Sequence, residues 1–225
     1  MKILIQIGGG MGDLDPRNQF KDGFTDFVKK KLQTQFYDKI LIIEANPFNI
    51  EKLSECWKNF SNVKIFDIAI VGQNYEGKSL DLYYTEDDKP SYQVTSKYKK
   101  HVEKHYPKSK ILSKNVKINR INDFLYEEAK NSTIEYLSID VEGMEFELIS
   151  SIDFNRFNIQ NISIEFLHLT KKIRKDLLNI LIKNGYSFKG KGFDIRGYDL
   201  MFQKKMNFIL YLKTKFFTPN IKKYI

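Results

Sequence analysis

The stretch Ile3-Leu4-Ile5-Gln6-Ile7-Gly8-Gly9-Gly10-Met11-Gly12 decides the fold of this chain. A short apolar run that stops abruptly at glycines is typical of a buried strand that ends in a tight turn. Further along, apolar side chains at helical spacing predict a helix over about 20–36, and an almost wholly aliphatic strand follows at 39–44. A helix at 46–58 and a strand at 63–66 come next. Apolar strands that alternate with helices predict a parallel sheet covered on both faces.

The alternation pauses over about 72–118 and then resumes. The pause contains one expected strand, a polar loop and a lysine-rich helix, with too few apolar residues for a core of its own. We interpret it as a lid-like insertion. The later elements are expected as helices at 120–130, 144–150 and 169–183 and strands at 134–139, 162–166, 186–188 and 198–202. The sequence therefore predicts an α/β fold with a mostly parallel seven-stranded sheet and helices on both faces. It forms one domain over 1–204, with an insertion at about 73–118 and a basic amphipathic tail over 205–225.

Composition limits the class of protein. The chain has 225 residues and 42% hydrophobic residues, as in an ordinary soluble globular protein, and no apolar run long enough to span a membrane. Its single cysteine, Cys56, excludes an intramolecular disulfide and, with no signal peptide at the start, favours the cytoplasm. The net charge of +9 fits either an anionic partner or a lysine-rich composition bias, and the lysines are scattered. The tail either packs on the domain or contacts a membrane surface. The oligomeric state is left open.

Three polar or glycine-rich features follow the first three strands. Gly8, Gly10 and Gly12 let the backbone turn tightly and approach a ligand, although the spacing fits a dinucleotide-binding glycine frame poorly and a plain turn is the alternative. Glu44 ends the second strand, where a carboxylate can accept hydrogen bonds from both hydroxyls of a ribose. Asp67 follows the third strand and suits the amino group of an adenine. Ligands in such sheets bind outside the carboxyl ends of the strands.

The segment Tyr136-Leu-Ser-Ile-Asp-Val-Glu-Gly-Met-Glu145 places two acids, Asp140 and Glu142, at the end of a buried strand. A buried carboxylate without a partner is costly, which favours a functional role. The alternative is that Glu142 caps the helix that begins near Met144.

This segment also carries a resemblance to a known family. Ile139-Asp-Val-Glu-Gly-Met-Glu145, followed by Ile162-Ser-Ile-Glu-Phe166, is similar to the signature of the FkbM-type methyltransferases. Ile42-Ile-Glu-Ala-Asn-Pro47 resembles the second-strand acid motif of the same family, and the resemblance covers about residues 3–203. It implies a Rossmann-like class I methyltransferase that depends on S-adenosyl-L-methionine.

The resemblance implies roles for individual residues. Gly8, Gly10 and Gly12 would line the methionine and ribose part of the cofactor, Glu44 would hold the ribose, and Asp67 with Ile68 would contact the adenine. The family usually has Asp-x-Gly where this chain has Gln6-Ile7-Gly8, so Gln6 would bind the amino acid part of the cofactor without a charge. On the acceptor side, the residues implied are Asp140 beside the methyl group, Glu142, Glu165 and His168 facing the acceptor, and Ser96 and His101 in the substrate-facing insertion.

An alcohol acceptor must lose its proton as it attacks, which requires a general base. The candidates are Asp140, His168 and His101; histidine has the more suitable ordinary pKa and Asp140 the better expected position. Some O-methyltransferases use Mg²⁺ held by strand-end carboxylates, and Asp140 with Glu165 could supply such ligands. No metal is predicted, but the question is left open.

The expected function is therefore O-methylation of a small molecule, with a sugar or polysaccharide precursor, glycan or nucleotide-linked, as acceptor. A nucleic-acid-associated methyltransferase and a non-catalytic Rossmann-like binding module are the alternatives. No interleaved basic and aromatic pattern points to nucleic acid, so no nucleic acid partner is expected. An NAD-dependent oxidoreductase is disfavoured by the poor glycine frame.

Overall fold

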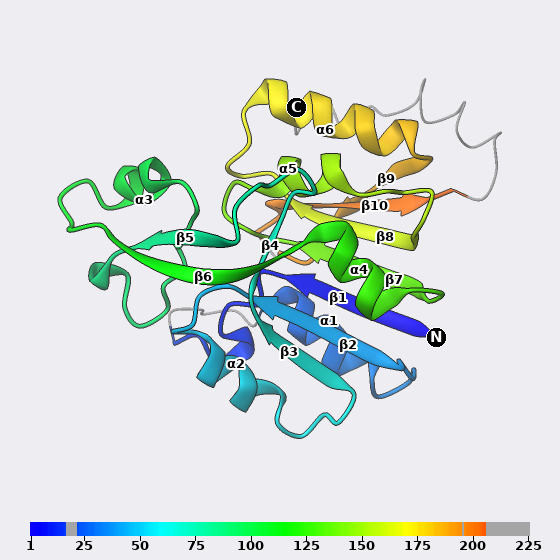
Figure 1. The fold of residues 1–225 in the computed structure, drawn as a ribbon. Coiled ribbons are helices and arrows are strands. Elements are labelled where there is room, and N and C mark those ends of the chain that lie inside the picture. The colour runs from blue at the N-terminus through cyan, green and yellow to red at the C-terminus, as the bar shows by residue number, and fades with distance from the viewer. Residues whose placement is uncertain (17–21, 195, 206–225) are drawn as a thin grey trace.

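The computed structural model describes residues 1–16, 22–194 and 196–205. Its main sheet has seven strands in the order β3-β2-β1-β7-β8-β10-β9 (Figure 1). Only β10 runs antiparallel to its neighbours β8 and β9, and the other pairs are parallel. The mostly parallel seven-stranded sheet predicted from the sequence is thus confirmed. The strands are β1 (Lys2–Ile7), β2 (Lys39–Glu44), β3 (Val63–Asp67), β7 (Thr133–Ile139), β8 (Asn158–Glu165), β9 (Tyr186–Lys191) and β10 (Asp199–Lys204).

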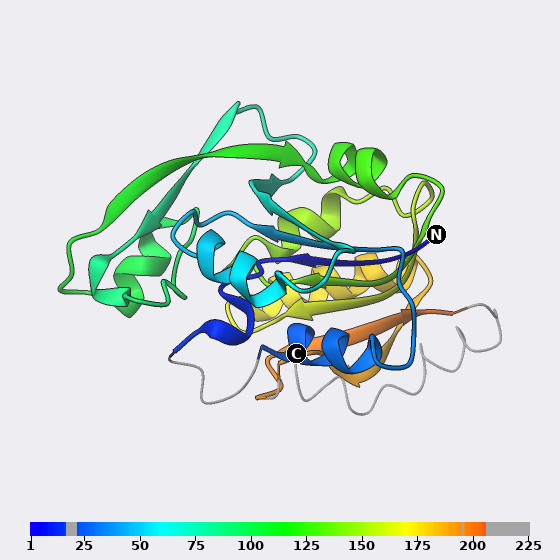
Figure 2. The same ribbon diagram turned by 90° about the horizontal axis from the view of Figure 1, so that it is seen from below.

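Helices cover both faces of this sheet, as Figure 2 shows from below. Side chains alternate along β1, so that Ile3, Ile5 and Ile7 pack with α4, α5 and α6, whereas Leu4 packs on the opposite face with α1 and α2. Gln6 is two residues after Leu4 in the strand, so its side chain points to the same face of the sheet as that of Leu4. The helices are α1 (Gly23–Lys31), α2 (Ile50–Trp57), α4 (Ile121–Ala129), α5 (Glu145–Ser151) and α6 (Lys171–Lys183), with a short 3-10 turn η1 (Gly12–Leu14) after the glycines.

The first helix is shorter than the sequence predicts. It begins at Gly23, where the side chain of Asp22 accepts a hydrogen bond from the N–H of Thr25, and it ends near Leu32. Phe36, which the apolar periodicity included, lies beyond the helix and is 76% exposed. The first residues of the expected helix, including Phe20, lie outside the described residues.

The insertion forms an arm with its own small sheet, in the order β4-β6-β5. The arm comprises β4 (Ala69–Val71), β5 (Ser79–Tyr84), the 3-10 turn η2 (Glu86–Asp88), α3 (Lys99–His105) and β6 (Leu112–Arg120). Only β5 and α3 were expected. An apolar cluster of Val71, Leu80, Leu82 and Val116 packs against Met144 of the main domain, so the arm shares its core with that domain.

The arm stands at the end of the main sheet to which the arrowheads of β1 and β2 point (Figure 1). The chain leaves β1 for β2 and β3 on one side, and returns through β7 on the other side. This change in strand order opens a crevice at the carboxyl ends of β1, β2 and β7, where ligands bind in open α/β sheets. No helix of the described part of the chain has the length and apolar character that a membrane crossing requires. The predicted boundary at 204 stays a prediction, since residues 206–225 of the predicted tail lie outside the described residues.

Candidate active site

A pocket of about 490 Å³ occupies this crevice, a size typical of small-molecule sites. The glycine turn, Glu44 and Asp140 all line it, although they come from the ends of three different strands. Ten of the residues predicted to form the site line the pocket: Gln6, Gly8, Gly10, Gly12, Glu44, Ile68, Ser96, Asp140, Glu142 and Glu165. The lining does not include Asp67, His101 or His168.

The glycine turn is built by close backbone packing. The N–H groups of Gly8 and Gly9 both donate to the carbonyl oxygen of Ile43, at 2.9 and 3.0 Å. Gly8 has a φ of +91°, and a Cβ atom there would lie 1.6 Å from the carbonyl oxygen of Asp140. Only glycine fits this position, because any side chain would separate β1 from the turn that follows β7.

Glu44 is held by backbone donors at the bottom of the crevice. Its Oε2 accepts a 2.6 Å hydrogen bond from the N–H of Gly10, and its Oε1 accepts one of 2.7 Å from the N–H of Asn46. Burial raises the pKa of Glu44 to about 7, and the two hydrogen bonds counteract part of that effect. Asp67 stands beside Glu44 in the β2–β3 register but is exposed and outside the lining, whereas the next residue, Ile68, lines the pocket.

Gln6 presents a buried acceptor to the pocket. The side chain is 3% exposed, and within the described ranges its Oε1 has no hydrogen-bond donor. Buried polar atoms are rarely left unpaired in folded proteins. Asp22, a further pocket residue that the sequence did not single out, has its pKa raised by burial. The geometry thus offers an amide oxygen and a nearby carboxyl to a hydrogen-bond donor in the pocket.

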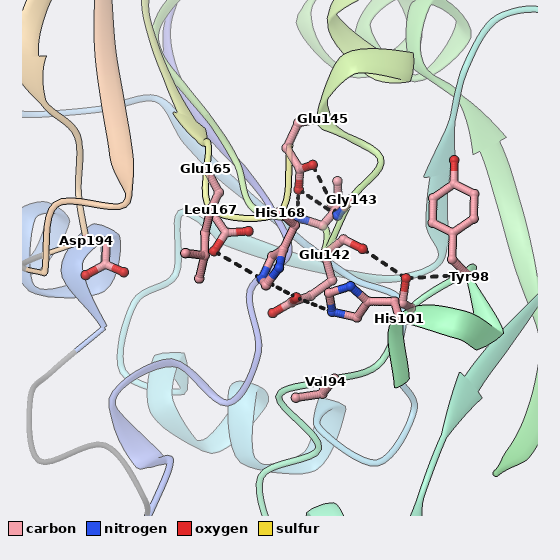
Figure 3. Close-up of polar contacts among 12 residues, drawn as sticks. Val94, Tyr98, His101, Glu142, Gly143, Glu145, Glu165, Leu167, His168 and Asp194 are labelled. Carbon is pink, nitrogen blue, oxygen red and sulfur yellow. Dashed lines mark hydrogen bonds and ion pairs between the residues drawn. The ribbon is translucent and has the colours of Figure 1, made fainter. Parts of the chain in front are cut away.

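The turn after β7 has a strained backbone that Glu145 holds in place (Figure 3). Glu142 and Gly143 have φ values of +52° and +108°, the left-handed region that a glutamate rarely adopts. The carboxylate of Glu145 accepts hydrogen bonds from the N–H groups of Val141, at 3.0 Å, and of Gly143, at 3.1 and 3.2 Å. Capping of α5 by Glu142, the alternative considered above, is therefore wrong: Glu145 binds the backbone, and Glu142 is free to face other groups.

Acidic side chains dominate the pocket, although the chain as a whole is basic. Among the residues that the structure describes, eight in the lining are acidic and two are basic; they are Asp15, Asp22, Glu44, Asp140, Glu142, Glu165, Asp194 and Asp199, with Lys97 and Arg196. Asp140 is open to the pocket but deep in the crevice, so burial raises its pKa well above the ordinary value, and the charges of Glu165 and Asp199 add to the effect. Burial and the same kind of repulsion raise the pKa of Glu165 to about 9. Together these carboxyl groups favour a cationic ligand.

The two predicted histidines lie together behind the pocket wall rather than in the lining. His101 on α3 and His168 after β8 each bring Nε2 to 3.0 Å from Oε2 of Glu142 (Figure 3). Burial acts to raise the pKa of Glu142, but the two imidazoles outweigh it and the pKa is lowered. His105 joins the group through ring contacts with both histidines. His105 follows His101 by one helical turn, and this spacing in the sequence could have indicated that the two rings lie on the same face of α3.

Ser96 connects the arm to the same turn. Its hydroxyl donates a 2.9 Å hydrogen bond to the carbonyl oxygen of Glu142 and accepts one of 3.2 Å from the N–H of Tyr98. Next to it, Lys97 forms an ion pair with Glu147 on α5. The observed contacts of Ser96 are therefore with the protein backbone, and they fix the arm against the Asp-x-Glu-Gly turn.

Several pocket residues were missed in the sequence. Asp194, Arg196 and Asp199 come from the last hairpin and line the side of the pocket near Glu165. Asp199 is paired directly with Glu165 in the β8–β10 register, and its pKa is raised to about 6, with burial as the largest cause. The sequence places Asp199 in the expected last strand, which was the available signal for it. Only the antiparallel register shows that Asp199 lies opposite Glu165.

A family profile described as "Methyltransferase FkbM domain" matches residues 17–188, more than half of the chain. A comparison with curated protein sequences found no match.

Among solved structures, the chain is similar to methyltransferase FkbM from Methylobacillus flagellatus KT, with a TM-score of 0.48 and 11% identity over 90% of this chain. It spans 44% of the length of that protein. It is also similar to a precorrin-6y C5,15-methyltransferase from Geobacter metallireducens GS-15, with a TM-score of 0.44 and 12% identity over 90% of this chain and 80% of the other. A third similar structure is SMU.1697c, a putative methyltransferase from Streptococcus mutans in complex with SAH, with a TM-score of 0.44 and 10% identity over 90% of this chain and 88% of the other.

The seven-stranded sheet, with its single antiparallel strand between β8 and β9, is the Rossmann-like class I methyltransferase fold that the resemblance implied. The extent of the profile match settles the family: this chain belongs to the FkbM methyltransferase domain family.

Proposed function

We propose that this chain transfers a methyl group from S-adenosyl-L-methionine to a hydroxyl of a small molecule, with a sugar or polysaccharide precursor as the acceptor class. The observation that carries the proposal is the acid-lined pocket in a chain with a net charge of +9. A surplus of carboxylates attracts the sulfonium and ammonium groups of this cofactor and repels the pyrophosphate of a nicotinamide dinucleotide.

The residues of the pocket fit the cofactor part by part. Glu44 keeps acceptor capacity beyond its two backbone hydrogen bonds, and it can take the hydroxyls of a ribose. Gln6 offers its unpaired Oε1 to the ammonium group, and Ile68 offers an apolar side chain to the adenine. Gly10 leaves the space beside it free of a side chain, since no atom lies within 4 Å of where its Cβ would be. When bound, the cofactor supplies an electrophilic methyl group on a positively charged sulfur.

On the acceptor side, we assign the proton-accepting role to Asp140. It lies open to the pocket, and burial raises its pKa, so its carboxylate is a stronger base toward the proton of the acceptor hydroxyl than an ordinary aspartate is. The O–CH₃ bond forms as the S–CH₃ bond breaks, and the hydroxyl proton passes to the Asp140 carboxylate. His101 and His168, the other candidates for the base, are in contact with Glu142 behind the wall, where they position that carboxylate.

An aromatic group at the pocket supports a sugar as the acceptor. Tyr92 lines the pocket and stacks on the partly exposed Phe48, with ring centroids 4.8 Å apart, and Tyr84 contacts both rings. Aromatic faces next to carboxylates match a sugar ring, which has apolar C–H faces and a rim of hydroxyl donors. The same acidic lining weighs against a nucleic acid in the pocket and favours a neutral glycan over a nucleotide-linked sugar.

A location in the cytoplasm belongs to this proposal, supported by the single cysteine and the cofactor that it requires. A non-catalytic binding module would keep cofactor binding but show no methyl transfer, so turnover separates it from the enzyme.

Thermal unfolding with added ligands tests the cofactor. A ligand that binds only the native state raises the unfolding temperature by mass action. S-adenosylhomocysteine should raise it and NAD should not; a shift with NAD alone would reject the proposal. Methyl transfer from labelled cofactor to neutral oligosaccharides, nucleotide-linked sugars and RNA then tests the acceptor, with the neutral oligosaccharide expected to be methylated.

A further inference from the structure

All three histidines of the chain meet at one place. His101 and His105 are one turn apart on α3 of the arm, and His168 follows β8 of the main sheet. The three ring centroids are 4.5, 4.7 and 5.7 Å apart. Two distant segments of the chain thus bring every imidazole to a single cluster, which composition alone does not explain.

The nitrogen and oxygen atoms of the cluster lie near the spacing of metal ligands. Each imidazole offers a ring nitrogen, and these three atoms all lie within 4.8 Å of one another. Oε2 of Glu142 is 3.0 Å from Nε2 of His101 and 3.0 Å from Nε2 of His168. Bonds of about 2.0–2.1 Å from imidazole nitrogen to a metal separate neighbouring ligand atoms by about 3.0–3.4 Å.

Hydrogen bonding inside the described part of the chain leaves the key atoms unsatisfied. Nε2 of His101 and Oε2 of Glu142 are buried and form no hydrogen bond of acceptable geometry in spite of their short separation. Oε2 of Glu165, in a side chain that is 7% exposed, is also without a donor there. Its Oε1 lies 3.8 Å from Nε2 of His168, so it belongs to the same cluster. A shared positive ligand would satisfy the lone pairs of these buried atoms.

We infer that His101, His105 and His168 form a binding site for one divalent first-row transition metal ion, located beside Glu142 at the acceptor wall of the pocket.

The ligand types favour a transition metal over magnesium. Neutral imidazoles bind Zn²⁺, Fe²⁺, Co²⁺ and Ni²⁺ well, whereas Mg²⁺ prefers oxygen ligands. Two histidines at positions i and i+4 of a helix present both rings on one face, an arrangement that zinc sites use. The carboxylates of Asp140, Glu145 and Glu165 form a second set whose oxygen atoms lie close enough together to hold a metal ion. In this set, however, the Glu145 carboxylate already accepts hydrogen bonds from the N–H groups of Val141 and Gly143. The histidine set is therefore the better site.

The position of the cluster gives it a use. Glu142 and Glu165 line the pocket, while the histidines stand behind them. An ion held there would lie at the border of the acceptor space, where an open coordination position can take an acceptor oxygen. This use depends on the proposed function; binding of the ion itself does not.

Metal titration of the tag-free 225-residue chain tests the site, because His101, His105 and His168 are its only histidines. The protein is stripped with a chelator, and Zn²⁺ is titrated by calorimetry in the absence of cofactor and acceptor; Co²⁺ is titrated in parallel, and its visible absorption reports nitrogen ligation. We expect saturation at one ion per chain. His105→Gln and His168→Gln should each weaken binding at least about tenfold, the lower end of the effect seen for residues that merely support metal ligands.

Lys100→Gln is the matched control, since Lys100 is exposed on the same helix, and it should bind as the wild type does. His105 is exposed as well, so its substitution leaves the fold intact and keeps the test decisive if His168→Gln fails to fold. Absence of saturable Zn²⁺ binding, or tight binding that survives His105→Gln, would overturn the inference. S-adenosylhomocysteine binding by the stripped protein distinguishes this result from failure of the proposed function.

Discussion

The N–H of Gly10 donates a 2.6 Å hydrogen bond to Oε2 of Glu44, across 34 positions of the chain. This bond fastens the loop after β1 to the end of β2. The carboxylate that we propose as the ribose-binding group therefore also shapes the glycine turn, so the proposed cofactor site and the local fold depend on the same side chain.

Substitution Glu44→Gln should weaken binding of S-adenosylhomocysteine by about 10- to 100-fold. The amide has one acceptor oxygen and no charge, and hydrogen bonds to a charged group contribute roughly 1.5–3 kcal/mol. Calorimetric titration measures the change. Glu55→Gln, an exposed glutamate on α2 that pairs with Lys58, is the matched control and should bind normally. An unchanged Kd in Glu44→Gln would mean that the cofactor lies elsewhere.

Two neighbouring glycines should respond differently to alanine. In Gly8→Ala the new Cβ would meet the carbonyl oxygen of Asp140 at 1.6 Å, so we expect a loss of unfolding free energy on the order of 3–5 kcal/mol, or failure to fold. Gly10 has a φ of +53° but no atom within 4 Å of such a Cβ, so Gly10→Ala should cost only about 1–2 kcal/mol. Urea denaturation compares them, and equal losses would contradict the close approach of β1 to the β7 turn.

Glu44 should make the ligand-free protein less stable as pH rises. Its pKa is about 7 in the folded state and 4.5 for an ordinary glutamate, so the folded state binds the proton more tightly. The stabilisation is complete below about pH 4.5 and is lost as pH rises through 7, a change on the order of 3 kcal/mol.

The difference in unfolding free energy between wild type and Glu44→Gln, measured from pH 5 to 8, isolates this contribution from other titrating groups. As pH rises, the unfolding free energy of the wild type should fall relative to that of Glu44→Gln. A constant difference would show that Glu44 titrates normally.

The pocket should discriminate between cofactor and product more strongly at high pH. Burial and neighbouring carboxylates raise the pKa of Glu165 to about 9, so its negative charge grows as pH rises toward 9. S-adenosylmethionine carries a positive sulfur and S-adenosylhomocysteine does not. The ratio of their Kd values should therefore move in favour of the cation by roughly fivefold, or about 1 kcal/mol. A pH-independent ratio in calorimetry would contradict the acidic surroundings assigned to the sulfur.

The sequence predicted the core of the site because strand ends are local signals. The apolar runs before Gly8, Glu44 and Asp140 marked three strands, and a parallel sheet necessarily brings such ends to one edge. Their convergence on a single pocket follows from topology alone. Glu145 was missed because it stands inside a helix in the sequence, and only the bend at Gly143 returns its carboxylate to the backbone.

The arm was harder to predict because its strands lack a continuous apolar run. In β6, the residues Lys114, Asn115, Lys117 and Asn119 are mostly exposed and only Val116 is buried, so the strand depends on its partners β4 and β5 rather than on its composition. The meeting of His105 with His168 depends on where this arm lies, and no spacing in the sequence contains that information. For Asp67, the sequence predicted the position at a strand end. It did not predict that the side chain is exposed and lies outside the pocket lining.

The arm has both of its ends anchored. Only Ile68 separates β3 from β4, and β6 passes into α4 without an intervening residue. A loop attached at one end could move aside to admit a bulky molecule. The arm is attached to the main domain at both ends, so a large movement would have to break hydrogen bonds between its strands. Entry should therefore depend on the width of the acceptor: if the acceptor is a glycan, as proposed, its unbranched chain ends should be methylated faster than its branched interior units.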